Sequence, residues 1–306
     1  MTTLVTGSAG LLGTSLKRIA TGDYYFADRS DADLTSHEET LALFKKIKPK
    51  RVIHLAAKVG GVEANKKYPG TFFHENMLIN LNVLGIAKDF GVEKLVSFIS
   101  TCVFPDAASY PLSSLDLHAG PPHPSNMGYA YAKRMLDVQS RAFRQEFGTN
   151  YITLVPANIY GPGDNWNIQS GHVVPSLIHK IHHAKHNNDS FIAWGTGSPL
   201  REFIYSDDIA RLALFAMEEY ESEEPLILSN SVETSIRDLV KNIAVIMSYK
   251  GRIDWDSSKP NGQERKPSDN SRMRTLIPSF EFTNLNDGLH TTIEWFERNY
   301  ESIIRK

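Results

Sequence analysis

Tyr129 and Lys133 are four residues apart in a segment whose pattern is typical of a helix, so both side chains leave the same face of it. A cation beside a phenol favours the phenolate. We therefore expect Lys133 to lower the pKa of Tyr129 and to make its hydroxyl a proton donor and acceptor. Ser100, at the end of a predicted strand, supplies a second hydroxyl for the same reacting oxygen. Together with a glycine-rich loop at the start of the chain, these residues indicate carbonyl–alcohol redox chemistry.

Cys102 and His172 suggest a second chemistry in the same place. A thiol can act as a base towards carbon acids when a neighbouring charge holds it near the thiolate, and a histidine can be the complementary acid. Simpler interpretations stay open, because a lone cysteine is usually a small buried hydrophobe and a histidine at a helix start can be a cap or a surface residue. On the next predicted helix, His179, His182 and His183 are expected to mark a solvated surface.

The glycine-rich loop follows a predicted strand over residues 4–6 and opens a predicted helix over residues 11–19. Glycines at this position allow a tight turn and a close approach of the backbone to a pyrophosphate, and the helix N-terminus stabilises the negative charge. The sequence therefore predicts a dinucleotide site. The residues of its loop are Gly7, Ser8, Ala9, Gly10, Leu11, Leu12 and Gly13.

Residues after the second and third predicted strands bear on the type of cofactor. Asp28 can bond a ribose 2′-hydroxyl and select NAD, whereas Arg29 can pair with a 2′-phosphate and select NADP, so these neighbours argue in opposite directions. Asp33 and Leu34 are candidates for contact with the adenine edge. Small side chains after the third strand would let a cofactor lie across the sheet edge, although core packing explains them equally well: Leu55, Ala56 and Ala57.

The elements that position these residues alternate between strand and helix. Strands are predicted over residues 4–6, 24–27, 51–57, 94–100 and 151–156, and helices over 11–19, 38–47, 72–90 and 129–147. Such alternation implies parallel pairing with right-handed crossovers. The predicted fold class is α/β, a doubly wound parallel sheet of the Rossmann type.

The pattern loosens beyond residue 158. Residues 161–165 read as a loop, and helices are predicted over 173–184, 207–218, 235–247 and 291–299. Short strands are predicted over 191–194, 202–205, 226–228 and 252–255, with a long loop over 256–270. We expect residues 1–165 to form the dinucleotide-binding domain, with a later stretch, about 201–230, returning to it. Residues 166–306 should mainly form a smaller C-terminal α/β substrate domain.

Composition excludes several classes of function. The net charge of −2 over 306 residues provides no basic field for nucleic acid. No apolar stretch approaches the roughly 20 residues that span a bilayer, and the strand-like start leaves no room for a signal peptide. A single cysteine cannot form an internal disulfide, which fits a reducing compartment. We expect a cytoplasmic protein without a metal site, a nucleic-acid partner or a membrane anchor.

Several motifs resemble the extended short-chain dehydrogenase/reductases and, more specifically, the GDP-L-fucose synthases. The resemblance runs over nearly the whole chain. The broader family is indicated by the Tyr/Lys motif at 128–133, and the narrower one by Cys102 and His172 within their segments. The segments that carry it are 54–61, 100–105, 128–133, 156–162, 164–165, 171–175, 194–197 and 201–203.

The resemblance implies a reaction that starts from GDP-4-keto-6-deoxy-D-mannose. Cys102 would be the base at C3 and C5, and His172 the acid that reprotonates from the opposite face. Tyr129, assisted by Lys133 and Ser100, would stabilise the enolate oxygen and then give it a proton as the nicotinamide delivers hydride to C4. The product would be GDP-L-fucose.

The resemblance also implies ligand contacts and an assembly. NADPH is the family's cofactor, which favours Arg29 over Asp28, and members are usually homodimers through helices that flank the sheet. Further cofactor contacts would come from Lys133, His172 and the segment Pro156, Ala157, Asn158 and Ile159. The nucleotide-sugar would be held by Lys180, Trp194, Arg201 and Asn261, where Asn261 replaces an acidic residue of some members.

Two other functions are alternatives to the synthesis of GDP-L-fucose. The first is another nucleotide-sugar epimerase, dehydratase or reductase of the same family. Dehydratases usually carry an Asp-Glu pair where this chain has Thr101-Cys102, and a 4-epimerase has no need of Cys102 with His172. The second is a non-catalytic NADP-sensing binding protein. A sensor of that kind should lack the intact pair of Tyr129 and Lys133.

Overall fold

A six-stranded parallel sheet forms the centre of the larger part of the molecule. The computed structural model describes residues 1–168, 171–259 and 261–304. The strands lie in the order β2-β1-β3-β4-β5-β9, and each neighbouring pair is parallel. Their bounds are β1 Thr3–Thr6, β2 Tyr24–Ala27, β3 Arg51–His54, β4 Lys94–Phe98, β5 Asn150–Pro156 and β9 Leu226–Leu228. The predicted doubly wound sheet is confirmed.

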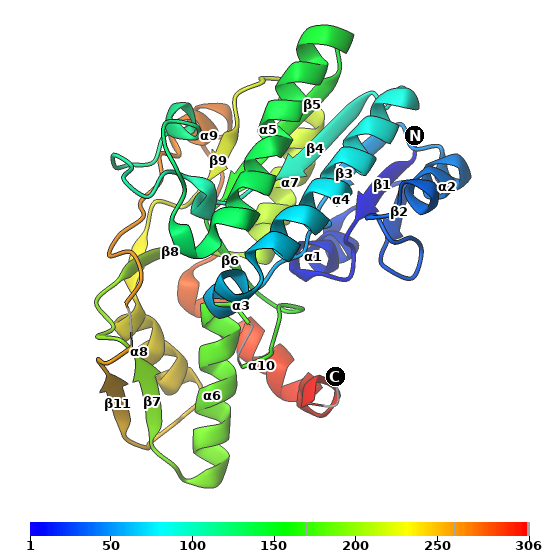
Figure 1. Cartoon of the computed structure of the whole chain (residues 1–306). Coiled ribbons are helices and arrows are strands. Elements are labelled where there is room, and N and C mark those ends of the chain that lie inside the picture. The colour runs from blue at the N-terminus through cyan, green and yellow to red at the C-terminus, as the bar shows by residue number, and fades with distance from the viewer. Residues whose placement is uncertain (169–170, 260, 305–306) are drawn as a thin grey trace.

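Helices cover both faces of this sheet because its strands alternate their apolar side chains between two cores (Figure 1). Leu4 packs into the core under α2, α4 and α5, whereas its neighbour Val5 packs into the core under α1, α7 and α9; Leu95 and Val96 divide in the same way. The bounds of these helices are α1 Leu11–Ile19, α2 His37–Ile47, α4 Pro69–Asp89, α5 Met127–Phe147, α7 Ser206–Glu219 and α9 Ser271–Leu276.

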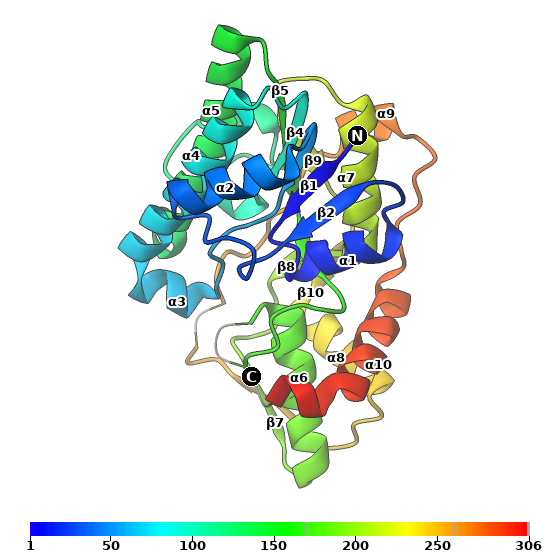
Figure 2. The same ribbon diagram turned by 90° about the vertical axis from the view of Figure 1, so that its right-hand side faces the viewer.

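The remaining elements surround a third core at one end of the large sheet (Figure 2). The helices there are α6 Val173–Asn187, α8 Ile236–Ile246 and α10 Leu285–Ile304. A parallel pair joins β7 Phe191–Trp194 to β11 Ile253–Asp256. A three-stranded sheet has the order β10-β8-β6, with bounds Glu233–Ser235, Leu200–Tyr205 and Asn158–Tyr160. Figure 1 shows α6 extending away from the large sheet, on the side where α3 and the beginning of α5 lie.

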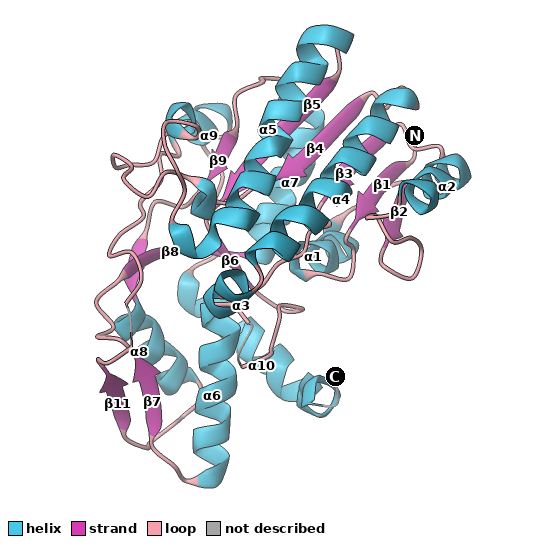
Figure 3. Cartoon of the chain, viewed as in Figure 1, coloured by secondary structure: helices cyan, strands magenta, loops and turns pink. Residues whose placement is uncertain are grey.

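Several short elements lie in the loops that connect the long helices and the strands (Figure 3). They are α3 Val62–Lys67 and the 3₁₀ turns η1 Thr101–Val103, η2 Ser114–Asp116 and η3 Pro124–Asn126. Ligand sites of open α/β sheets lie beyond the carboxyl ends of the strands, and η1 directly follows β4 at such an end.

Several predicted boundaries were wrong. The strand predicted over 51–57 ends at His54, opposite Thr6, because β1 offers no further partner, so residues 55–57 lie outside it. The strand predicted over 94–100 similarly ends at Phe98. The last helix was predicted over 291–299 but runs from Leu285 to Ile304. Strands β6 and β10 and helices α3 and α9 were not predicted.

Of the three histidines of α6 that were expected on a solvated surface, His183 is exposed, but the expectation was wrong for His179 and His182. His179 and His182 are each 7% exposed and pack against Phe296 and Tyr300 of α10. Burial, reinforced by neighbouring positive charge, lowers the pKa of His182 to about 4, so this ring is neutral at physiological pH. The polar pattern of α6 concealed a helix–helix contact that aromatic rings complete.

Among the described residues, no helix combines the length and the apolar character that crossing a bilayer would require.

Candidate active site

The glycine-rich loop is packed too tightly to accept side chains. Gly7 has φ +71°, and a Cβ atom there would lie 2.6 Å from the backbone N of Ala56. A Cβ atom on Gly13 would lie 2.4 Å from the Cα of Ser8. Ser8 is fully buried, and its Oγ has no hydrogen-bond partner among the residues that the structure describes. A bare backbone turn that carries an unpaired buried hydroxyl and opens helix α1 fits a pyrophosphate.

Asp28 and Arg29, which favour different cofactors, have different surroundings. Oδ1 of Asp28 accepts hydrogen bonds from the N–H and the hydroxyl of Ser30, at 2.9 and 2.7 Å, and these bonds lower the pKa of Asp28. Arg29 is exposed. Asp33 is engaged in the same manner as Asp28, by the N–H and hydroxyl of Thr35. The guanidinium of Arg29 is thus the group at this turn that is exposed and positively charged.

The other residues expected at the cofactor lie along the same edge of the sheet. Leu55 packs partly into the core shared with α1 and α7, while Ala56 donates its N–H to Thr6 Oγ1 and abuts Gly7. Core packing therefore accounts for Leu55, while Ala56 borders the glycine-rich loop. At the end of β5, Ala157 N–H bonds Leu228 O, and Asn158 Nδ2 bonds Glu202 O at 2.8 Å.

Ser100 and Cys102 are side by side immediately after β4. The Oγ of Ser100 is 2.9 Å from the Sγ of Cys102, and it also accepts from the N–H of Cys102 as the cap of η1. Side chains from the next elements hold this turn. Asn126 Nδ2 donates to the carbonyl of Cys102 at 2.8 Å, and Arg134 Nε donates to the carbonyl of Val103 at 2.7 Å. The thiol is therefore fixed from both the strand side and the α5 side.

Tyr129 and Lys133 lie in the first turns of α5, as predicted, and the structure brings them close to Cys102. Lys133 is 3% exposed and donates from Nζ to the carbonyl of Phe98 at 2.9 Å. Burial lowers the pKa of Lys133 to about 8, and a negative charge on Cys102 would oppose that change.

The expectation that Lys133 lowers the pKa of Tyr129 was wrong. The pKa of Tyr129 is raised, first by burial and then by the charge of Cys102. The physical reason is that the phenolate loses its hydration in this setting, while the ammonium of Lys133 is directed to the carbonyl of Phe98. Tyr129 therefore keeps its proton at neutral pH, which is the form that a proton donor needs.

His172 immediately precedes α6, and its hydrogen-bond partner is Asp164. Its Nδ1 is 2.9 Å from Oδ1 of Asp164, whose side chain is 2% exposed, whereas that of His172 is 49% exposed. The hydrogen bond that His172 donates to Asp164 raises the pKa of His172, against the smaller opposing effect of burial. This favours the protonated imidazolium, the form that an acid needs.

The four residues expected at the nucleotide-sugar form two pairs. Nζ of Lys180 lies 4.7 Å from the ring centre of Trp194, which is 56% exposed. Arg201 bonds the carbonyl of Gln263 at 2.7 Å, and Asn261 Oδ1 accepts from the N–H of Thr196 at 2.8 Å. The first pair is an open aromatic–cation surface. The bonds of Arg201 and Asn261 attach the segment 261–268 to β8 and to the turn that follows β7.

Sequence reasoning missed two charged residues of this region. Asp164 stands out in the sequence only as part of the segment 164–165 that resembles the family. Its contact with His172 lies within an irregular loop, where no periodic pattern could indicate it. Lys266 lies within electrostatic range of Cys102, Arg201 and Asp106, and burial lowers its pKa. Its segment is fastened to the Cys102 side because Gln263 Nε2 donates to Asp106 Oδ1 at 2.9 Å.

Comparison with known proteins agrees with this geometry. Residues 3–228 match the model of the NAD dependent epimerase/dehydratase family. The chain is 45% identical to GDP-L-fucose synthase of Dictyostelium discoideum, over 98% of this chain and 97% of that one. The corresponding values for a probable GDP-L-fucose synthase of Drosophila melanogaster are 41%, 97% and 98%.

A solved structure agrees as well. The crystal structure of a GDP-L-fucose synthetase from Naegleria fowleri bound to NADP superposes with a TM-score of 0.94 at 38% identity, covering 98% of this chain and 95% of that one. Identity at this level over the full length includes both parts of the molecule, the large sheet and the smaller unit. The chain therefore belongs to the NAD dependent epimerase/dehydratase family and, within it, to the GDP-L-fucose synthases.

Proposed function

We propose that this chain converts GDP-4-keto-6-deoxy-D-mannose to GDP-L-fucose, by epimerisation at C3 and C5 followed by NADPH-dependent reduction of the 4-ketone. The observation that carries the proposal is the contact of Ser100 Oγ with Cys102 Sγ beside Tyr129 and Lys133. This cluster combines a base for carbon acids with a proton donor for a carbonyl oxygen. A reductase alone would need only the second.

Cys102 acts first in this scheme. A 4-ketone acidifies the hydrogens at C3 and C5, because each carbanion is delocalised into an enolate. The Cys102 thiolate takes the proton from carbon, and the electron pair moves to the carbonyl oxygen. The hydroxyls of Tyr129 and Ser100 stabilise the negative oxygen by hydrogen bonds. Two cations, Lys133 and Lys266, lie within electrostatic range of Cys102.

His172 completes each epimerisation. Its imidazolium returns a proton to carbon from the opposite face, which inverts the centre and restores the ketone. The hydrogen bond to Asp164 raises the pKa of His172 and so favours the charged form of this acid. The base and the acid come from different elements, since Cys102 lies in η1 and His172 immediately precedes α6.

The reduction uses the same oxygen. When bound, NADPH supplies a hydride for C4. The hydroxyl of Tyr129 gives its proton to the oxygen as negative charge develops there, and the raised pKa of Tyr129 ensures that the proton is present. Lys133, which bonds the Phe98 carbonyl, keeps a buried cation in the cluster where this negative charge develops.

We assign the cofactor to the glycine-rich loop and to Arg29. The Gly7 and Gly13 turn leaves room for a pyrophosphate and none for side chains, and the orphaned hydroxyl of Ser8 is available to it. Arg29 is exposed beside the engaged carboxylate of Asp28, which favours a 2′-phosphate and hence NADPH. The NADP-bound relative from Naegleria fowleri supports this choice.

The substrate's nucleotide end is assigned to the smaller part of the molecule. Trp194 offers a face for the base, and Lys180 and Arg201 offer charge for the diphosphate. Asn261 shapes the site through Thr196. On this assignment residues 1–165, with about 201–230, bind the cofactor, and 166–306 mainly bind the substrate.

We further propose a cytoplasmic homodimer that pairs through α4 and α5. These helices pack side by side on one face of the sheet and expose apolar side chains, among them Phe73, Leu81, Val138 and Phe147, at 43 to 48%. A free thiol that acts as a base suits a reducing compartment. Sedimentation velocity of the native protein and of Leu81→Glu tests the pairing, since the variant should be monomeric.

The reaction itself is tested with GDP-4-keto-6-deoxy-D-mannose and NADPH in deuterated water, with the sugar read by NMR. We expect oxidation of NADPH and GDP-L-fucose labelled at C3 and C5. Reduction without label at those carbons would establish a simple 4-reductase and would remove Cys102 and His172 from the mechanism. Absence of turnover would direct the search to other nucleotide-sugars.

A further inference from the structure

We propose that Asp164 is a positioning residue for His172, holding the imidazole with Nδ1–H turned inward so that Nε2 carries the transferable proton. The role of His172 as acid rests on the function proposed above. The contact between the two side chains does not, because it is present in the chain itself. Three features of the structure lead to this inference.

The first feature is the geometry of the contact. Oδ1 of Asp164 is 2.9 Å from Nδ1 of His172 and also accepts the N–H of Asn165 at 2.7 Å. A carboxylate accepts and does not donate, so the ring nitrogen that faces it must carry hydrogen. The neutral ring is then the Nδ1–H tautomer, and the second proton enters and leaves at Nε2.

The second feature is the uncompensated charge of Asp164. Its side chain is 2% exposed, and its Oδ2 is buried without a hydrogen-bond partner among the described residues. A buried carboxylate in this state needs a positive neighbour. His172 is the titratable residue that lies against Asp164, and protonation of its ring supplies the positive charge.

The third feature is the position of His172 at the N-terminus of α6. As the N-cap it has extended backbone angles, φ −66° and ψ 169°, but its side chain makes no capping bond. The positive end of the helix dipole disfavours an imidazolium there. Asp164 is the opposing charge, and it raises the pKa of His172 against the effect of burial.

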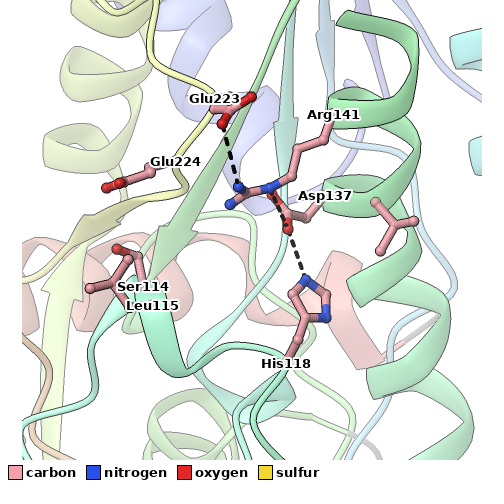
Figure 4. A pocket seen from close by; sticks show the side chains of 8 residues that line it. Ser114, Leu115, His118, Asp137, Arg141, Glu223 and Glu224 are labelled. Atoms are coloured by element: carbon pink, nitrogen blue, oxygen red, sulfur yellow. Dashed lines mark hydrogen bonds and ion pairs between the residues drawn. The ribbon is translucent and has the colours of Figure 1, made fainter. Parts of the chain in front are cut away.

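A second histidine–aspartate pair in the molecule shows what a shared carboxylate looks like (Figure 4). Nε2 of His118 lies 2.8 Å from Oδ2 of Asp137, whose side chain is 1% exposed. Arg141 Nε, however, bonds both oxygens of Asp137 at 3.0 Å. Asp137 therefore already has a permanent cation, whereas Asp164 relies on His172. The two pairs differ in whether protonation of histidine is required for charge balance.

One consequence concerns turnover. The side chain of His172 is 49% exposed, so its outer nitrogen can regain a proton from water after each transfer. Asp164 then restores the same tautomer and the same charge before the second epimerisation. A single acid can thereby serve both carbons.

The first test is an NMR titration of the histidine rings without substrate. The chain has 11 histidines, so His172→Gln identifies the signal of His172. We expect its midpoint to lie above the ordinary value of about 6.5 and to fall by about one pH unit in Asp164→Asn. Asp164→Glu should keep a raised midpoint. Asp189→Asn, which removes an exposed carboxylate just past α6, should leave it unchanged.

The ¹⁵N shifts of the native protein test the tautomer without any variant that must fold. Above its midpoint His172 should be the Nδ1–H tautomer, and an Nε2–H tautomer would overturn the proposal. An unmoved midpoint in Asp164→Asn would also overturn it. Both readouts need no substrate, so they stand whether or not GDP-L-fucose is formed.

Kinetics test the role in the reaction. In Asp164→Asn, deuterium incorporation into the sugar at pH 8 should slow by about tenfold, with less change at pH 6, while KM stays near its native value. A merely structural role would slow the reaction equally at both values of pH. That result would overturn the assignment of Asp164 as a positioning residue.

Discussion

The Oγ atom of Ser100 lies 2.9 Å from the Sγ atom of Cys102 and also accepts the N–H of Cys102. One serine thus contacts the thiol and, in the mechanism that we propose, offers its hydroxyl to the oxygen of a bound ketone. This contact joins the epimerisation and reduction chemistries, because the same enolate oxygen is stabilised in the first and protonated in the second. We expect substitution of Cys102 to affect mainly the epimerisation and substitution of Tyr129 to affect mainly the reduction.

Replacing the thiol should affect epimerisation selectively. We expect Cys102→Ser to slow solvent deuterium incorporation at C3 and C5 by at least about 100-fold, because a serine hydroxyl is a far weaker base than a thiolate. Binding of NADPH, measured by fluorescence titration, should be unchanged. Since Cys102 is the only cysteine, alkylation of the native protein provides a matched chemical test. Normal deuterium incorporation in the variant would remove Cys102 from the mechanism.

Replacing the phenol should affect reduction. We expect Tyr129→Phe to lower the rate of NADPH oxidation by about 100- to 10,000-fold, because the variant lacks the phenol that donates the proton. Tyr131→Phe is the control, since that ring lies on the same helix but packs on Arg134, 5.5 Å from its guanidinium carbon. Undiminished oxidation in Tyr129→Phe would refute the role as donor.

The buried ammonium of Lys133 should reduce stability at neutral pH. Its pKa falls from 10.5 to about 8 on folding, so the unfolded chain binds more protons between these values. The free energy of unfolding should therefore rise with pH through this window, by roughly 3 kcal/mol in total. Below about pH 8, Lys133 is charged in both the folded and the unfolded chain, so the destabilisation is present in full.

Lys133→Met should accordingly be an inactive but stabilised variant. After about 1 kcal/mol is allowed for the lost bond to the Phe98 carbonyl, we expect it to be more stable than the native chain at pH 7 by about 2 kcal/mol. Urea unfolding at pH 7 and pH 9.5 measures this, and the variant should lack the native rise. A variant less stable at pH 7 would mean that the hydrogen bond outweighs the burial.

Arg29 should determine the choice between cofactors. We expect Arg29→Ala to raise KM for NADPH by about 10- to 100-fold and to leave KM for NADH nearly unchanged, because only the former has a 2′-phosphate. Lys45→Ala removes an exposed cation from α2 and serves as the control. Equal effects on both cofactors would place the 2′-phosphate elsewhere.

Gly7 should be irreplaceable for steric as well as conformational reasons. Gly7 and Gly91 both have positive φ, +71° and +63°, but a Cβ atom on Gly91 meets nothing within 4 Å. We expect Gly91→Ala to cost about 1 kcal/mol of stability, and Gly7→Ala to cost more and to abolish NADPH binding. Thermal unfolding with and without NADPH compares them. Similar behaviour of the two variants would show that the clash with Ala56 is relieved by movement.

Much of the larger part of the molecule followed from local patterns. Pairs such as Leu4 and Val5 are apolar in succession because each faces a different core, and this is the signature of a strand buried on both sides. The i, i+4 spacing of Tyr129 and Lys133 required only that α5 be a helix. The smaller part was less readable. Short strands such as β6 and β10 owe their existence to distant partners in β8.

The sequence by itself determined the alternation of strand and helix, the glycine turn and the types of residue that could do chemistry, because these depend on neighbours within a few positions. Tertiary structure alone decided that Asp164 faces His172, that Lys266 lies near Cys102 and that burial raises the pKa of Tyr129. Charge balance and desolvation are sums over everything packed around a group. Residues far apart in the chain contribute to those sums, and no local pattern records them.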